Sequence, residues 1–200
     1  MMPHVEVVGP TIKLRYAVEA DAERLLELAS DREVTRWFSW GPYSTLAEPQ
    51  AYIATLERRR EAGELLDFVI DHHADGVIGV TGLCELAARD RRATVGTWVG
   101  RPHWGTGANP ESKQLIGALA FGHLGFDRLT AWANTRNGRS QLALERAGFT
   151  REGVLRGWHR HGEERHDVVV FRLLRGEWRP QIDAQVSGEA PEAFRVGPTP

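Results

Sequence analysis

The sequence predicts an α+β protein with a mixed, mostly antiparallel central sheet and helices on both faces. Its 200 residues, of which 42% are apolar, suit one globular domain of ordinary size. Apolar residues follow a helical period in the amino-terminal third and alternate with polar residues in the middle, and both patterns recur toward the end. Short polar turns join the middle strands, which favours antiparallel neighbours over the crossovers of a doubly wound parallel sheet.

The amino-terminal third is predicted to contain one strand followed by helices. Apolar and polar residues alternate over residues 11–18, as in a half-buried strand. Three helices are expected next, because each candidate start has a capping residue or a capping box. These starts are Asp21, Asp31 and the Thr45–Glu48 pair, and the third helix is expected to run to Gly63.

The middle of the chain is predicted to form strands over residues 65–71, 77–86 and 93–100. A glycine-containing loop, residues 101–109, leads from the third of these strands into a helix over residues 110–124. The residues that bound this helix are Asn109 as N-cap, Pro110 in the first turn and Gly125 just past the end.

The last part of the chain is predicted to alternate strands with one helix before a flexible tail. The expected elements are a strand over 129–133, a helix over 137–147 that stops at Gly148, and a hairpin of 152–159 with 165–174. Residues 179–200 hold four prolines, two glycines and few large apolar residues, so a flexible tail is expected there. The expected globular domain therefore spans residues 1–178.

Composition argues against several classes of protein. A formal net charge of −2 and a pI near 6.5 give no basic excess for binding nucleic acid or an anionic membrane. The single cysteine, Cys84, excludes an internal disulfide and a cysteine-based metal cluster, and no complete ligand spacing among the histidines predicts a metal site. The first residues have neither the basic flank nor the apolar core of a signal peptide, so a cytoplasmic protein is expected.

The loop before the predicted helix carries the most informative residues. Gly105 and Gly107 let the backbone approach a ligand without an obstructing Cβ. The helix start leaves unpaired N–H groups and a positive dipole end facing the loop, a combination that binds phosphate or pyrophosphate. The alternative is that the glycines only allow the chain to turn. Neither nucleotide motif matches, because Gly107 lacks the following Lys of a Walker loop and Pro110 stands where a dinucleotide motif needs a third glycine.

The chain resembles the GNAT superfamily of acyl-CoA-dependent N-acyltransferases, and within it the RimJ/RimL-like group. The resemblance covers residues 11–178 and rests on the order of the elements together with several motifs. These are Trp98-Val99 leading into Trp104-Gly105-Thr106-Gly107, Asn137-Gly138-Arg139-Ser140 leading into Gly148-Phe149, and the ending Glu152-Gly153-Val154-Leu155-Arg156 with Asp167-Val168-Val169-Val170-Phe171. The resemblance implies a sheet splayed at the cofactor strand, acetyl-CoA as co-substrate, and a homodimer as one arrangement found in the family.

The resemblance also implies which residues bind the cofactor. The loop would hold the CoA pyrophosphate through backbone N–H groups, and Trp98 and Val99 would pair their backbone with the pantetheine arm. Asn137 would hydrogen-bond near the reacting end. Where the superfamily has a Gln or Arg before the first glycine this chain has Pro102, next to Arg101. The full expected set is Trp98, Val99, Arg101, His103, Trp104, Gly105, Thr106, Gly107, Ala108, Asn109 and Asn137.

Three residues are predicted to take part in catalysis. Ser140 matches the position that lies near the CoA sulfur in RimL-like enzymes, and Asn137 lies beside it. The tyrosine acid of many relatives is replaced by Leu144, so Ser140 or an ordered water would protonate the thiolate. Glu85 is a candidate base acting directly or through water, its alternative being a surface carboxylate. Cys84 is interpreted as a small core residue.

An aromatic cluster between the early helices is the candidate acceptor site. Trp37, Trp40 and Tyr43 would either shape an amine pocket or pack in the core. The predicted reaction moves an acetyl group directly to a primary amine, either a protein N-terminal amine or a small-molecule amine. A non-catalytic acyl-CoA-binding module and a nucleotide-binding protein are the alternatives.

Overall fold

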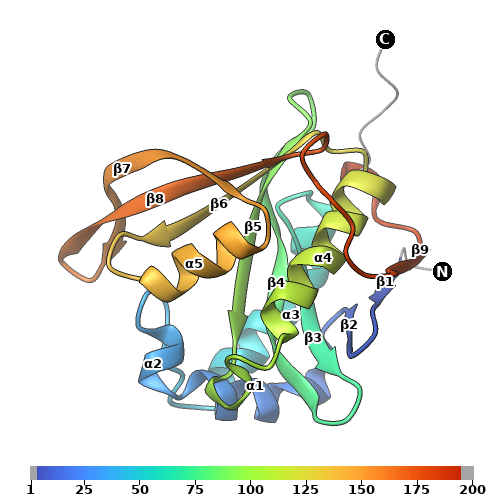
Figure 1. Ribbon diagram of the computed structural model, residues 1–200. Helices are drawn as coiled ribbons and strands as arrows, with labels where there is room; N and C mark the ends of the chain where they lie inside the picture. The colour runs from blue at the N-terminus through green and yellow to red at the C-terminus, as the bar shows by residue number, and fades with distance from the viewer. Residues whose placement is uncertain (1–3, 195–200) are drawn as a thin grey trace.

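The computed structural model describes residues 4–194 and contains a nine-stranded sheet with helices on both faces (Figure 1). The strand order across the sheet is β7-β8-β6-β5-β4-β3-β2-β1-β9. This confirms the predicted fold class, a mixed and mostly antiparallel sheet. The strands are β1 (Val5–Val8), β2 (Ile12–Arg15), β3 (Leu65–His72), β4 (Gly76–Ala87), β5 (Arg92–Val99), β6 (Arg128–Asn134), β7 (Thr150–His161), β8 (Glu164–Leu174) and β9 (Gln185–Gly188).

The sheet splays open between β5 and β6. Within residues 4–194 this is the one parallel pair, and its register covers only Arg92–Arg128, Ala93–Leu129 and Thr94–Thr130. Beyond Thr94 the two strands diverge, as Figure 1 shows, with α4 in front of β4 and β5 and α5 in front of β6. The edge of β5 after Thr94 therefore has no strand beside it, and outward backbone N–H groups of this edge can face a ligand.

The helices occupy both faces of the sheet. A large core lies between the sheet and α4, and a smaller one, made of Leu25, Val69, Val77 and Val80, lies on the face covered by α1 and α3. We call the face of the sheet that α1 and α3 cover the α1–α3 face. None of the helices within the described range is long and apolar enough to span a membrane. The helices are α1 (Ala22–Ala29), α2 (Arg32–Thr35), α3 (Ala47–Glu61), α4 (Ala108–Gly117) and α5 (Gly138–Arg146), with a π-helical turn at Ala118–His123 and 3-10 turns at Glu19–Asp21, Arg101–His103 and Glu192–Phe194.

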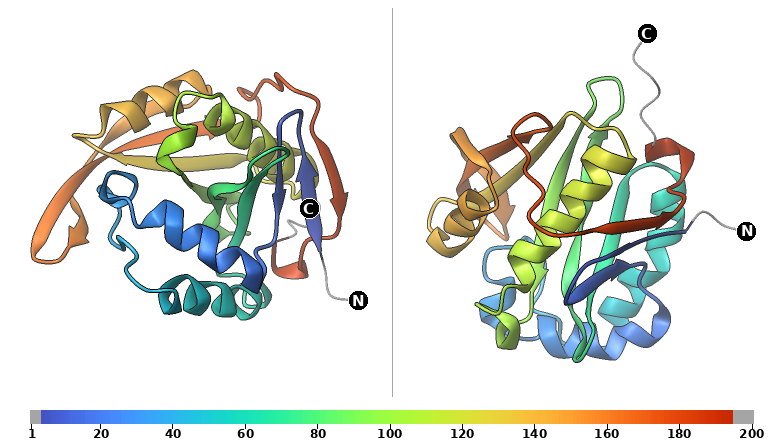
Figure 2. Two further views of the ribbon diagram at one scale, coloured as in Figure 1. Left: turned by 90° about the horizontal axis from the view of Figure 1, so that it is seen from below. Right: turned by 45° about the vertical axis from the view of Figure 1, so that its right-hand side comes forward.

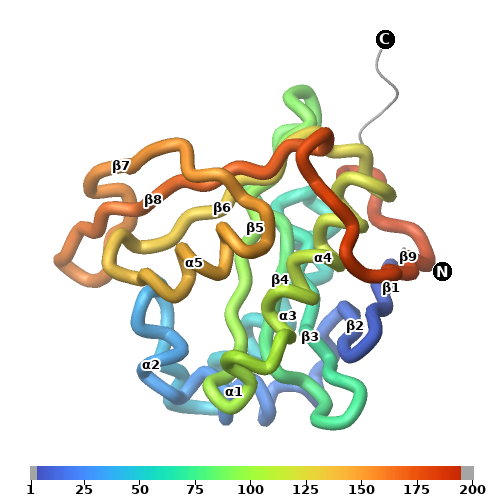
Figure 3. Tube along the Cα trace, in the orientation of Figure 1, coloured from blue at the N-terminus to red at the C-terminus, as the bar shows by residue number. Residues whose placement is uncertain are grey.

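The segment predicted to be a flexible tail is partly built into the sheet. Strand β9 pairs antiparallel with β1 over Val5–Gly188 to Val8–Gln185, and Figure 3 traces it back beside the amino-terminal strand. Ala190 and Phe194 are each only 1% exposed. The expectation of a flexible tail is therefore wrong for 185–194, because these residues bury apolar surface that composition alone hides. Residues 195–200 lie outside the described part of the chain.

Strand β1 is a second element that the sequence reasoning did not predict. It pairs with β2 and supplies two fully buried valines, Val5 and Val7. Val5 and Val7 alternate with the less buried Glu6 and Val8, as in a strand with one buried face. Four residues are too few to separate a strand from a loop by periodicity alone. The right-hand view of Figure 2 shows β1 and β9 at the far edge of the sheet from α5.

Helix α4 begins earlier than predicted. It starts at Ala108 with Gly107 at the N-cap, where φ is +97°, so the prediction of Asn109 as N-cap is wrong. The Asn109 side chain instead accepts a hydrogen bond from Lys113 one turn later. The predicted end is confirmed, because Gly125 has φ +85° and follows the π-helical turn.

Candidate active site

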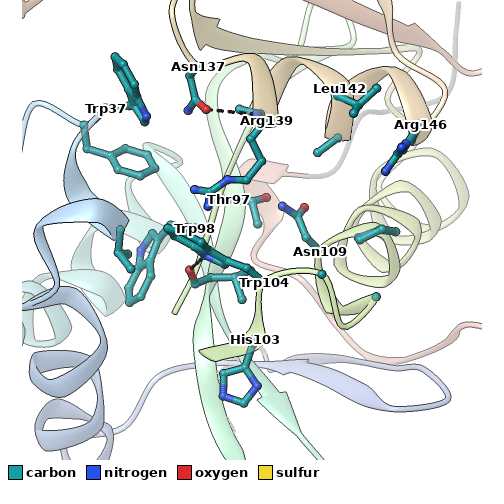
Figure 4. A pocket seen from close by; sticks show the side chains of 18 residues that line it. Trp37, Thr97, Trp98, His103, Trp104, Asn109, Asn137, Arg139, Leu142 and Arg146 are labelled. Carbon is teal, nitrogen blue, oxygen red and sulfur yellow. Dashed lines mark hydrogen bonds between the residues drawn. The ribbon is translucent and has the colours of Figure 1, made fainter. Parts of the chain in front are cut away.

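A cavity of about 400 Å³ lies at the splay between β5 and α5 (Figure 4). Its walls come from β5, the loop after it, the start of α4, one face of α5 and the segment around α2. The lining residues are Val34, Trp37, Phe38, Thr97, Trp98, Val99, His103, Trp104, Gly105, Gly107, Asn109, Pro110, Asn137, Arg139, Ser140, Leu142, Ala143 and Arg146. The motifs that are separated by some forty residues in the sequence therefore meet in one place.

The glycine loop forms one end of this cavity with open space above it. Gly105 and Gly107 have φ of +81° and +97°, and a Cβ added to either would meet no atom within 4 Å. Both glycines are exposed, and α4 begins immediately after them with unpaired N–H groups in its first turn. The geometry fits an anion such as a pyrophosphate, held by backbone donors and the positive end of the helix.

Two arginines from α5 give the cavity positive charge. The Arg139 guanidinium lies 3.2 Å from the centroid of the Trp104 ring, and burial there lowers the pKa of Arg139. Arg146 lines the same cavity two turns further along, and none of the lining residues within the described chain is Asp or Glu. The sequence reasoning missed both arginines. The spacing of residues 139, 142, 143 and 146 on one helical face was the pattern that could have revealed them.

The free edge of β5 presents backbone donors to the cavity. Gly100 N donates to Ile78 O on β4, so the neighbouring residue, Val99, directs its backbone groups to the opposite side. The indole Nε1 of Trp104 donates to Val99 O at 2.7 Å and fixes the Trp104 ring beside this edge. The amide N–H of Val99 consequently faces the gap between β5 and β6.

The start of α5 brings Asn137 and Ser140 to the cavity wall. Asn137 is the N-cap, as predicted, and its Oδ1 accepts a hydrogen bond from Ser140 N at 3.2 Å. This cap fixes the first turn of α5, so the side chains of Ser140 and Arg139 both project into the cavity, as Figure 4 shows for Arg139. Leu144, in the place of the family tyrosine, is 4% exposed and packs in the large core instead.

Three of the expected cofactor residues lie outside the cavity lining. Arg101 points to Asp31, with 3.6 Å between its Nη1 and the carboxylate. The Thr106 hydroxyl donates to His103 O, and Ala108 is buried in the core. Their backbone still forms the loop, but their side chains do not reach the cavity. His103 does line it, and burial lowers the pKa of its ring.

The aromatic cluster divides between the cavity and the packing behind it. Trp37 lines the cavity together with Phe38. Trp40 lies behind them, with its ring centroid 5.3 Å from those of Phe38 and Tyr43 and 5.8 Å from that of Trp98. Neither Trp40 nor Tyr43 is among the lining residues. Trp37 therefore faces the cavity, whereas Trp40 and Tyr43 pack beside the lining residues, and a role of Trp37 in binding an amine stays a prediction.

The candidate base Glu85 lies away from the cavity. It is exposed at a β-bulge in β4, with φ +50°, and its carboxylate accepts a hydrogen bond from Thr94 Oγ1 at 2.9 Å. The neighbouring Cys84 is half-buried, and desolvation, aided by the charge of Glu85, raises the pKa of its thiol to about 12. A thiol held protonated is a poor nucleophile, which agrees with its interpretation as a packing residue.

Fold and cavity together fit one class of protein, in which a phosphate-bearing ligand binds in the splay of a mixed sheet beside a free strand edge. Comparison with known proteins identifies the family. The model of the GNAT acetyltransferase domain matches residues 11–150, and the chain belongs to that family. It is an N-acetyltransferase, and acetyl-CoA is its co-substrate.

Individual relatives agree with this assignment. The uncharacterized N-acetyltransferase p20 of Bacillus licheniformis is 29% identical over 84% of this chain and 94% of the relative. YdaF of Bacillus subtilis, provisionally named a ribosomal N-acetyltransferase, is 28% identical over 86% of this chain and 95% of the relative. The crystal structure of an acetyltransferase from T. thermophilus, also provisionally named, matches with a TM-score of 0.75 and 30% identity, covering 86% of this chain and 90% of that one.

Proposed function

We propose that the protein transfers the acetyl group of acetyl-CoA directly to a primary amine within a ternary complex. The observation that carries this proposal is the convergence, in one cavity, of the glycine loop, the free edge of β5 and the capped start of α5. Backbone N–H groups that can donate hydrogen bonds to an anion lie at one end of the cavity, and the Ser140 hydroxyl lies on its wall. A thioester bound along β5 would thus be held at both its phosphate end and its reacting end.

Each group of cavity residues has a proposed role in binding or catalysis. The backbone N–H groups of residues 105–109 and the side chain of Arg146 bind phosphate, while the β5 edge pairs with the pantetheine arm. The N–H of Val99 faces the gap and is a donor for the thioester carbonyl oxygen as negative charge develops on it. Ser140 is the proposed proton donor to the departing thiolate. Asn137 acts by capping α5 and so fixing the Ser140 position.

The acceptor is proposed to enter on the α1–α3 face and to contact Trp37 and Phe38, which line that side of the cavity. A protein N-terminal amine is the preferred acceptor class, because the RimJ/RimL-like motifs imply it. The provisional name of YdaF, a ribosomal N-acetyltransferase, supports a protein acceptor. A small-molecule amine is the other candidate. A solved structure of spermidine N-acetyltransferase from Vibrio cholerae shares the fold at 18% identity, with a TM-score of 0.72.

A non-catalytic acyl-CoA-binding module is the second candidate function. The observations that favour it are Leu144 in the core, where relatives place a tyrosine acid, and Glu85 outside the cavity. Such a module would bind acetyl-CoA and CoA but would release no thiol with any amine.

Two measurements test these proposals in sequence. Thermal unfolding with acetyl-CoA, CoA, ATP or NAD should show stabilisation by the two CoA forms only. At about a hundred times the dissociation constant, ligand binding adds ~2.7 kcal/mol, which raises the midpoint by roughly 5–10 °C for a domain of this size. Thiol release is then measured with a panel of peptides and small amines. Release with at least one amine supports transfer, release with none favours the binding module, and the absence of any CoA-dependent shift contradicts both.

A further inference from the structure

A carboxylate outside the cavity lining lies on the α1–α3 face of the sheet, close to the splay. Asp67 on β3 stands in register with Gly82 on β4, and Gly82 stands in register with Gly96 on β5. The adjacent row, Val69, Val80 and Trp98, packs on the α1–α3 face. Because side chains two residues apart share one face of a strand, the row of Asp67 lies on that face as well.

The two glycines leave an open lane beside the carboxylate. A Cβ added to Gly82 would lie 2.1 Å from Asp67 Oδ1, so the carboxylate leans across Gly82 in the direction of β5. A Cβ added to Gly96 would meet nothing within 4 Å. Apart from the chain neighbours of Gly96, no atom therefore lies within 4 Å of the Cβ position on β5 that follows Asp67 and Gly82 in this row. Any residue larger than glycine at position 82 would close the lane.

Tyr52 on α3 holds the carboxylate in this position. Its hydroxyl donates to Asp67 Oδ2 at 2.8 Å, which leaves Oδ1 directed toward the lane. Burial raises the pKa of Asp67 to about 6, an effect partly offset by the Tyr52 hydrogen bond and by the positive charges of Arg59 and Arg60 on α3. The thiol of Cys84 on β4 is the other titratable group influenced by Asp67. A carboxylate with a pKa near 6 is ionised at neutral pH and still accepts a proton readily.

We propose that Asp67 is the proton acceptor for the incoming amine, and that Tyr52 is its positioning residue. The proposal rests on the acetyl transfer proposed above. The ammonium form of the acceptor gives one proton to Asp67, directly or through one water in the lane. The neutral nitrogen forms a C–N bond to the thioester carbonyl carbon and the C–S bond breaks. The departing sulfur takes the proton of the Ser140 hydroxyl, and the second nitrogen proton restores that hydroxyl. Asp67 then releases its proton to solvent.

This assignment replaces Glu85 as the base. Glu85 and Asp67 both lie near the start of the splay, but Glu85 is exposed at a bulge and bonded to Thr94. Asp67 lies in a half-buried position with open space toward β5. The register of three strands that creates this space is a tertiary feature, so the sequence pattern around Asp67 gave no indication of it.

The test compares Asp67→Asn and Tyr52→Phe with wild type, using acetyl-CoA and an amine that the wild type acetylates. The control is Asp90→Asn, the same chemical change in the exposed β4–β5 turn. The dependence of kcat/KM for the amine on pH is measured from pH 5 to 9. Wild type and the control should lose activity below about pH 6, following the pKa of Asp67. Asp67→Asn should lower kcat at neutral pH by about 10²–10³-fold and abolish that pH limb, with the acetyl-CoA dissociation constant unchanged.

Tyr52→Phe supplies a readout that a structural role would not produce. It removes a hydrogen bond that lowers the pKa of Asp67, so the acidic limb should move to higher pH while kcat at alkaline pH is retained. An Asp67→Asn enzyme that binds acetyl-CoA normally and keeps the wild-type kcat would overturn the proposal. An acidic limb of the Tyr52→Phe pH profile that lies at the same pH as in wild type would also overturn the proposal. If Asp67→Asn does not fold, the Tyr52→Phe profile alone tests the proposal. Absence of thiol release by wild type with every amine overturns the transfer itself and the role of Asp67 with it.

Discussion

At the residue scale, Gly107 places the first turn of α4 against the cavity. Its φ of +97° is a conformation that residues with a Cβ rarely adopt, and the space above it is open. The backbone conformation of Gly107 and its lack of a side chain have different effects. The positive φ affects folding stability, whereas the missing side chain affects the approach of a phosphate to the backbone.

The Gly107→Ala substitution should separate these two quantities. We expect the free energy of unfolding to fall by about 1–2 kcal/mol, the cost of a left-handed conformation for a non-glycine residue. We also expect the acetyl-CoA dissociation constant, measured by calorimetry, to rise at least about tenfold, a change of about 1.4 kcal/mol. Gly162→Ala is the matched control, since Gly162 has φ +58° in the distant β7–β8 turn with no atom near an added Cβ. Equal affinity losses in both variants would show that the effect is not local to the loop.

Asp67 makes a second prediction at this scale, about stability rather than catalysis. Its pKa of about 6 in the folded protein lies above the ordinary value of 3.8. Between these values the folded state binds more protons than the unfolded state, so this residue makes stability fall as pH rises from about 4 to 6. Asp67→Asn removes that dependence. Urea unfolding should therefore show the variant gaining on wild type by on the order of 2 kcal/mol between pH 4 and pH 7. A constant difference across this range would contradict the raised pKa.

At the element scale, Arg15 joins β2 to the start of α1 and to β3. Its Nη1 and Nη2 each lie 2.8 Å from the carboxylate of Asp21, and its Nε lies 2.6 Å from Asp71. The three side chains are largely buried, and the two carboxylates raise the pKa of the guanidinium above its usual value. The planar group of Arg satisfies both acids at once, which a lysine does not do.

Removing this guanidinium should be costly because two partly buried carboxylates lose their partner. We expect Arg15→Met to lower the free energy of unfolding by about 3 kcal/mol, and Arg15→Lys to restore less than half of that loss. The control is Arg36→Met, which removes an exposed pair with Glu33 and should change stability by less than about 0.5 kcal/mol. Chemical denaturation at pH 7 measures all three variants. Full rescue by lysine would show that charge alone, rather than the forked geometry, stabilises this junction.

At the scale of the whole molecule, the two ends of the described chain lie side by side at one edge of the sheet. β9 pairs with β1, and Phe194 packs in the large core at 1% exposure. Residues 185–194 therefore stabilise the fold although they follow the acetyltransferase domain as the sequence predicted it. The boundary of the acetyltransferase domain at residue 178 otherwise stays a prediction.

Phe194→Ala tests the contribution of this closing segment. We expect a loss of about 3–4 kcal/mol of unfolding free energy, as for other large side chains removed from a core. Val18→Ala is the comparison, because Val18 is 54% exposed and should cost less than about 0.5 kcal/mol. A loss at Phe194 as small as at Val18 would mean that this segment detaches from the core in solution. Thermal and urea unfolding followed by circular dichroism give both values.

Local chemistry explains which elements were predictable. Asp31 accepts a hydrogen bond from Glu33 N, and Asn137 caps α5 in the same way, because a capping side chain acts only on the next few backbone groups. The predicted hairpins over 65–86 and 152–174 are also confirmed, since each joins adjacent strands through a short turn. By contrast, β1 and β9 are short, and they pair with each other across almost the whole length of the chain, a long-range contact that periodicity does not report.

The sequence by itself determined the order and type of most elements, the position of the glycine loop and the family to which the chain belongs. These follow from contacts between near neighbours and from motifs that stay together along the chain. Only the tertiary structure decided that Arg139 and Arg146 face the cavity, that Glu85 does not, and that residues 185–194 complete the sheet. It also decided that Asp67 leans across Gly82 toward β5. The physical reason is that strand register and the splay depend on how distant segments pack, and no local pattern encodes that packing.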